Sequence, residues 1–106
     1  MNVKEIVEII HLNLPNCRIN LLSCIPCVES LQGYQAKGNS LRSNATLRMV
    51  FAEYQRMIPY TYVHLINMFD ALLDRAGQVD PADFKDGLHV NDQGYAKLVT
   101  YVKTRL

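Results

Sequence analysis

The stretch Arg18-Ile19-Asn20-Leu21-Leu22-Ser23-Cys24-Ile25 decides the fold that this sequence predicts. It is short and almost continuously apolar, and Pro26 ends it. Strands covered on both faces by helices have this pattern, whereas a strand with one face in water alternates apolar and polar residues. We therefore expect residues 18–25 to form an interior strand of a parallel sheet.

A second strand is predicted at Tyr62-Val63-His64-Leu65-Ile66-Asn67. Apolar residues recur at helical spacing before, between and after the two strands. The second helix is expected to bury Leu47, Val50, Phe51, Tyr54 and Met57, and the third Tyr95, Leu98, Val99 and Val102. The order helix, strand, helix, strand, helix predicts an α/β fold with parallel strands and helical crossovers.

Three polar residues or pairs are placed to cap these helices. Asn2 can cap the first helix, Ser43 or Asn44 the second, and Asn91 or Asp92 the third. Residues 27–42 are polar and rich in glycine, and indicate a long loop. Two strands are too little sheet for an independent doubly wound domain, so the predicted fold is locally consistent and globally incomplete.

Composition excludes several classes of protein. The 106 residues suit one domain at most, and the net charge of +1 comes with no basic stripe, so we expect no nucleic-acid partner. No apolar run is long enough to span a bilayer. Three cysteines argue against a disulfide-stapled miniprotein.

Cys24-Ile25-Pro26-Cys27 has the spacing of redox and zinc sites. A redox pair normally opens a helix, whereas this pair ends a strand, and no second pair completes a zinc site. A small redox protein therefore remains only a minor alternative. His11 and His64 have no partner at ligand spacing and are interpreted as packing or surface residues, so we expect no metal and no cofactor.

The segment Asp86-Gly87-Leu88-His89-Val90-Asn91-Asp92-Gln93-Gly94-Tyr95 resembles the last motif block of SGNH (GDSL-type) ester hydrolases. The resemblance covers residues 1–106 as a single partial domain, the later half of the family's domain. It implies a partial flavodoxin-like, three-layer α/β/α arrangement in which the two strands are the fourth and fifth. In this family the block supplies the acid and base of a serine esterase.

The resemblance assigns His89 as the general base and Asp86 as the acid that orients it. In such sites a neutral histidine takes the serine proton, and a carboxylate fixes the tautomer and stabilises the imidazolium. A carboxylate near a histidine is also common elsewhere, so Asp86 by itself fits a turn residue beside a surface histidine. The decapeptide around the dyad favours the catalytic interpretation.

The family's nucleophile and oxyanion-hole blocks have no matching positions in this sequence. Gly38-Asn39-Ser40-Leu41 differs by one residue from the family's Gly-Asp-Ser-Leu signature. The genuine signature follows an apolar strand, whereas this one precedes a helix, so we interpret it as chance similarity.

Two functions follow as expectations. The first is a hydrolase of acyl or acetyl esters that is inactive until a missing half completes it. The alternative is a non-catalytic remnant or interaction module. The expected partners are a second copy of the chain, bound through an exposed sheet edge, or a separate amino-terminal half.

Overall fold

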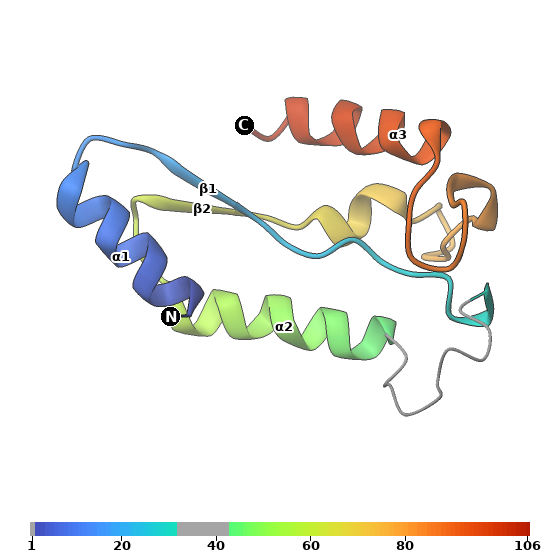
Figure 1. Ribbon diagram of the computed structural model, residues 1–106, viewed down its shortest axis with the longest axis horizontal. Coiled ribbons are helices and arrows are strands. Elements are labelled where there is room, and N and C mark those ends of the chain that lie inside the picture. The colour runs from blue at the N-terminus through green and yellow to red at the C-terminus, as the bar shows by residue number, and fades with distance from the viewer. Residues whose placement is uncertain (1, 32–42) are drawn as a thin grey trace.

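The computed structural model describes residues 2–31 and 43–106 (Figure 1). Helices and two short strands alternate along the chain, and three single 3₁₀ turns join them. The elements are α1 (Val3–Asn13), β1 (Ile19–Leu22), η1 (Glu29–Leu31), α2 (Asn44–Met57), β2 (Val63–Ile66), η2 (Met68–Leu72), η3 (Pro81–Asp83) and α3 (Asp92–Lys103). None of the helices in these ranges has the length and apolar character needed to cross a bilayer.

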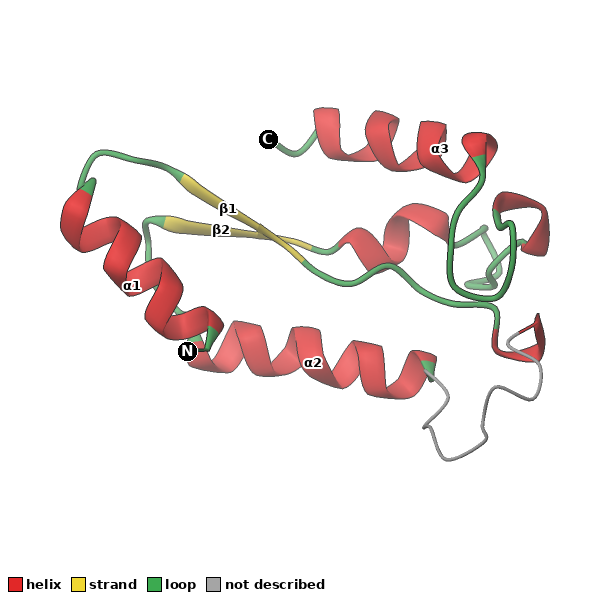
Figure 2. Cartoon of the chain, viewed as in Figure 1, coloured by secondary structure: helices red, strands yellow, loops and turns green. Residues whose placement is uncertain are grey.

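The two strands pair in parallel, as the sequence predicted, and the register runs from Ile19 opposite Val63 to Leu22 opposite Ile66. The chain thus has the α/β fold with helical crossovers. Each strand is shorter than predicted, at four residues (Figure 2). The first strand ends early because its partner β2 ends at Ile66 and is followed by η2, so the extended chain beyond Leu22 has no strand beside it.

The helices form two layers, one on each side of the strands. Figure 1 shows α3 on one side of the sheet, with α1 and α2 on the other. Each helix begins at a capping residue that the sequence predicted. Asn2 accepts a hydrogen bond from the backbone of Glu5, Ser43 from that of Thr46, and Asn91 from that of Gly94. Such caps satisfy N–H groups that have no partner within the first helical turn.

The hydrophobic core includes Val7 of α1 and Ile66 of β2, but its packed cluster lies beyond the carboxyl ends of the strands. Val28, Leu72 and Phe84 form a buried cluster there. The side chains of Ile25, Val79, Val90 and Leu98 pack against that cluster. In contrast, Leu22 in β1 is 45% exposed. The core therefore fixes the loops that follow the strands more firmly than it covers the sheet.

Two residues predicted to be buried are exposed. Tyr95 is 63% exposed and Met57 is 40% exposed. The first turn of α3 packs through Gly94 against the backbone of Asp83, so the next residue, Tyr95, points outward. Helix α2 ends at Met57, and the turn in the chain buries Ile58 in its place.

We predict that Gly94→Ala destabilises the fold more than Gly77→Ala. A Cβ on Gly94 would overlap the carbonyl oxygen of Asp83 and lie 3.0 Å from Cβ of Val90. We expect this overpacking to lower the free energy of unfolding by about 2–3 kcal/mol. Gly77 has a φ of +77° and open space around its missing Cβ, so its replacement should cost about 1 kcal/mol. Urea unfolding followed by circular dichroism measures both; the reverse order would contradict the packing described for Gly94.

Candidate functional site

Asp86 and His89 lie three residues apart in the loop between η3 and α3. The carboxylate Oδ2 of Asp86 is 2.9 Å from Nδ1 of His89. Oδ1 of Asp86 accepts hydrogen bonds from the backbone N–H groups of Leu88 and His89, both at 2.7 Å. These backbone bonds form an Asx turn, which holds the carboxylate in place beside the ring. The side-chain hydrogen bond that the sequence predicted is therefore present.

The donors around Asp86 keep its carboxyl group ionised. They lower its pKa from the ordinary 3.8 to about 2; the backbone N–H of His89 contributes most, then the His89 ring, then the backbone N–H of Leu88. A carboxylate can only accept hydrogen bonds, so the hydrogen between the two side chains resides on Nδ1 of His89. Nε2 of the neutral ring then carries a lone pair and is able to take a proton.

This Asp86–His89 dyad lies at the carboxyl end of the sheet and is open to solvent. The carbonyl oxygen of Gly87 accepts a hydrogen bond of 2.9 Å from the N–H of Val28, which follows β1 in the chain. The side chains of Asp86 and His89 are 54% and 75% exposed. In open α/β sheets, sites occur beyond the carboxyl ends of the strands. The loop of residues 84–91 between η3 and α3, called the dyad loop below, has this location.

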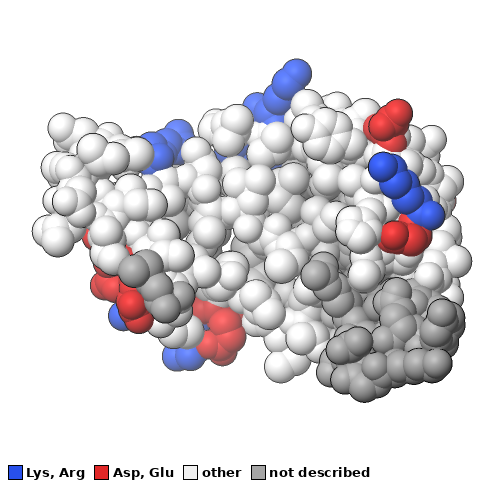
Figure 3. Space-filling model, in the orientation of Figure 1, with Lys and Arg blue, Asp and Glu red and all other residues white. Residues whose placement is uncertain are grey.

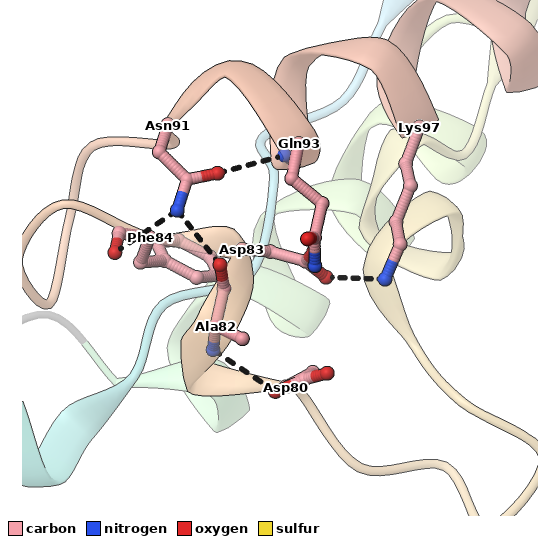
Figure 4. Close-up of polar contacts among 8 residues, drawn as sticks. Asp80, Ala82, Asp83, Phe84, Asn91, Gln93 and Lys97 are labelled. Atoms are coloured by element: carbon pink, nitrogen blue, oxygen red, sulfur yellow. Dashed lines mark hydrogen bonds and ion pairs between the residues drawn. The ribbon is translucent and has the colours of Figure 1, made fainter.

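The base of the dyad loop is closed by Asn91. Its side-chain nitrogen donates to the carbonyl oxygens of Ala82 at 2.7 Å and Phe84 at 3.4 Å (Figure 4). Its backbone N–H donates to the carbonyl oxygen of Asp83 at 2.9 Å. Asn91, at the end of the loop, therefore binds the residues at the start of the loop, and it also caps α3.

Three polar side chains next to the loop were missed in the sequence. The carboxylate of Asp83 is fully buried and accepts from Gln93 Nε2 and Lys97 Nζ, each at 2.8 Å (Figure 4). No local pattern marks this cluster, because Asp83 and Lys97 are separated by the whole dyad loop and the first turn of α3. The glycine at position 94 was the one available signal of close packing there.

A hollow of about 330 Å³ has Val28 in its wall, and the N–H of the same residue donates to Gly87 of the dyad loop. Asn44 and Cys27 hold one side of it together: Asn44 accepts from the N–H of Cys27 at 2.8 Å and donates to its carbonyl oxygen at 2.9 Å. On another side, the Arg48 guanidinium lies 4.2 Å from the centre of the Phe69 ring. The hollow thus combines a cation with polar and apolar walls.

The other candidate residues are not gathered into a site in the described part of the chain. Cys24 is exposed and Cys27 is buried, on extended chain rather than at the start of an α-helix. The His11 ring stacks on Tyr62 at 3.6 Å, and His64 contacts the carbonyl oxygen of Arg105. Residues 2–31 and 43–106 contain no group of metal-binding side chains, and Gly38–Leu41 lies outside the described residues.

Comparison with known proteins supports the fold. No protein-family model matches the chain, and no curated protein matches it. A solved structure from Streptococcus pneumonia, of a "putative platelet activating factor", is similar to the chain with 31% sequence identity and a TM-score of 0.81. The similarity covers 96% of this chain and 47% of the solved one. The chain therefore spans about half the length of this structural neighbour.

We predict that the carboxyl group of Asp86 titrates near pH 2, as its lowered pKa requires. Because this pKa lies below the ordinary value of 3.8, the contribution of Asp86 to stability is present above about pH 4 and is lost as the pH falls toward 2. Carbon-detected NMR of Asp86 Cγ measures the midpoint. In His89→Ala the pKa should rise only part of the way, because the backbone donors of Leu88 and residue 89 remain. A midpoint at 3.8 or above in the unaltered chain would show that these hydrogen bonds do not persist in solution.

Proposed function

We propose that this chain supplies the acid–base half of an SGNH-type hydrolase of carboxylic esters. His89 acts as the general base, and Asp86 orients it. The observation that carries the proposal is the 2.9 Å contact between Nδ1 of His89 and Oδ2 of Asp86, on a carboxylate fixed by two backbone N–H groups. The resemblance of residues 86–95 to the family's last motif block supports the same assignment.

The proposed reaction uses the free nitrogen of the ring. Nε2 of His89 takes the proton of a hydroxyl group as its oxygen attacks the ester carbonyl, and then returns the proton to the leaving alkoxide. The acyl intermediate is then cleaved by a water molecule that gives a proton to the same nitrogen, and the proton returns to the hydroxyl oxygen as the acid is released. Asp86 stays ionised throughout and stabilises the imidazolium that forms in both stages. The low pKa of Asp86 suits this role, because a protonated acid would orient the ring but offer it no charge.

The described serines do not supply the nucleophile in this proposal. Ser23 is buried, and its Oγ accepts from the N–H of Met68; Ser43 caps α2. Ser30 makes no hydrogen bond with His89 among the contacts of the described residues. We propose that the nucleophile and the oxyanion donors come from further polypeptide, in line with the 47% of the structural neighbour that the chain covers.

The proposed substrates are acyl or acetyl esters. The neighbour's name refers to platelet activating factor, and the resemblance of residues 86–95 to the last motif block of ester hydrolases supports an ester as the substrate class. The hollow beside Val28 offers about 330 Å³, enough for a small acyl or alcohol group, and Val28 connects it to the dyad loop through Gly87. We propose that part of the substrate occupies this hollow while its carbonyl faces His89.

We predict that the chain alone hydrolyses p-nitrophenyl acetate no faster than its His89→Ala variant, because loss of a nucleophile costs about 10⁶-fold in kcat. A chimera, in which this chain replaces the matching 47% of the structural neighbour, should hydrolyse the ester. In the chimera, Asp86→Asn should lower kcat about 10³–10⁴-fold, since the ring then loses its orienting charge. Stopped or continuous absorbance assays at pH 7.5 measure all of these rates.

The chimera experiment needs two controls. The unaltered neighbour must hydrolyse the same ester, and a His64→Ala chimera should keep its rate, because His64 contacts the carbonyl oxygen of Arg105 away from the dyad. Hydrolysis by the chimera that survives His89→Ala would reject His89 as the base. Hydrolysis by the chain alone that Ser40→Ala abolishes would reject our interpretation of residues 38–41.

A specific observation favours a second role, as a self-associating interaction module. The N–H groups of Ile19 and Ser23 donate to the carbonyl oxygens of Tyr62 and Ile66. The alternate strand residues Asn20 and Leu22 therefore direct their backbone groups to the opposite edge of β1, which has no strand beside it in the described chain. The surface shown in Figure 3 is mostly uncharged, and its charged side chains are scattered. We propose that two copies pair through this edge about a two-fold axis.

We predict that sedimentation equilibrium at low micromolar concentration finds a dimer or larger species. Leu22→Lys should weaken the association at least about tenfold, because a lysine on a free edge opposes strand pairing. Met49→Lys is the matched control: Met49 is 67% exposed on α2, away from the strand, and its replacement should change nothing. A cooperatively folded monomer for the unaltered chain would overturn this second role.

A further inference from the structure

An ion pair between a buried carboxylate and a half-exposed lysine joins η3 to α3 immediately beside the dyad loop. The carboxylate of Asp83 has no exposed surface, and Lys97 Nζ lies 2.8 Å from its Oδ2. Gln93 Nε2 donates to Oδ1, also at 2.8 Å. A buried carboxylate is costly unless a cation and hydrogen bonds compensate it, so the position of Lys97 and Gln93 on α3 determines where Asp83 is able to lie (Figure 4).

The backbone of Asp83 is also one end of the dyad loop. Its carbonyl oxygen accepts from the N–H of Asn91, and residue 84 pairs with Val90 in an antiparallel bridge. Inside that bridge, the N–H of Lys85 donates to the carbonyl oxygen of His89 at 2.8 Å. The loop therefore has a closed base, and the side chain of one residue in that base, Asp83, binds Lys97 in the second turn of α3.

We propose that Asp83 and Lys97 are positioning residues that hold the dyad loop in the geometry in which Asp86 binds His89. They touch neither His89 nor Asp86 and act only through the loop base. A contribution of Asp83 and Lys97 to catalysis rests on the function proposed above, whereas their effect on the geometry of the dyad loop does not. Gln93 strengthens the same connection with a hydrogen bond that carries no charge.

The test uses the full chain and reads the dyad loop separately from the rest of the fold. Solvent-exchange NMR follows two pairs of amides. Those of Leu88 and His89 donate to Asp86, and those of Ile19 and Ser23 donate to the carbonyl oxygens of Tyr62 and Ile66 in the neighbouring segment of the sheet. In Lys97→Met the first pair should exchange at least tenfold faster while the second pair changes less than twofold. The ¹⁵N signal of His89 Nδ1 should at the same time lose the character of a nitrogen that donates to a carboxylate.

Three further variants make the result decisive. Lys97→Arg should restore the exchange rates to within about twofold of the unaltered chain, since arginine also provides a cation. Lys103→Met removes an exposed lysine from the last turn of α3 and should change neither pair. Gln93→Ala, which keeps the ion pair, should speed exchange at Leu88 and His89 about threefold, and it decides the question if Lys97→Met fails to fold.

Unchanged exchange at Leu88 and His89 in both Lys97→Met and Gln93→Ala would overturn the proposal. Equal acceleration of all four amides would also overturn it, because the ion pair would then stabilise the whole fold rather than the loop. Neither result uses ester hydrolysis. A chimera that depends on His89 would therefore leave the proposed function standing even if the positioning role failed.

Discussion

The first turn of a helix has N–H groups that need hydrogen-bond acceptors from outside the helix. The structure around the dyad depends on Asn91, which supplies such an acceptor for α3. Its side-chain oxygen caps the helix by accepting a hydrogen bond from the N–H of Gly94. Its side-chain nitrogen holds the loop base together by donating hydrogen bonds to the carbonyl oxygens of Ala82 and Phe84. The start of α3 and the base of the dyad loop are consequently joined through the side chain of one residue.

The two carboxylates at this junction are stabilised in opposite ways. Asp86 is exposed and is kept ionised by short hydrogen bonds from its own loop, which lower its pKa to about 2. Asp83 is buried and depends on Lys97 and Gln93, which lie beyond the loop. An exposed carboxylate with local donors is available to an adjacent ring, whereas a buried one with distant partners is suited to fixing two elements against each other. The difference in burial thus separates a chemical role from a structural one.

The sequence predicted those features of the fold and site that arise from local patterns. Each cap at Asn2, Ser43 and Asn91 is defined within three residues, and the Asx turn at Asp86 spans the same distance. The pair of Asp83 and Lys97 could not be predicted in this way, because it depends on how a loop returns α3 to η3. The exposure of Tyr95 was mispredicted for the same reason: the contact of Gly94 with Asp83 rotates the first turn of α3, and helical periodicity alone does not contain that contact.

The local completeness of the dyad contrasts with the open edge of the sheet. The hydrogen bonds found for residues 85–90 have their partners within residues 82–91, apart from the one that Val28 donates to Gly87. The strands, in contrast, have one partner each, and Leu22 is left 45% exposed. The hydrogen bond between Asp86 and His89 therefore needs no group from beyond this chain, whereas a continuous sheet does. The loop by itself sets the orientation of the His89 ring, and the open edge of β1 is the place at which a further strand would extend the sheet.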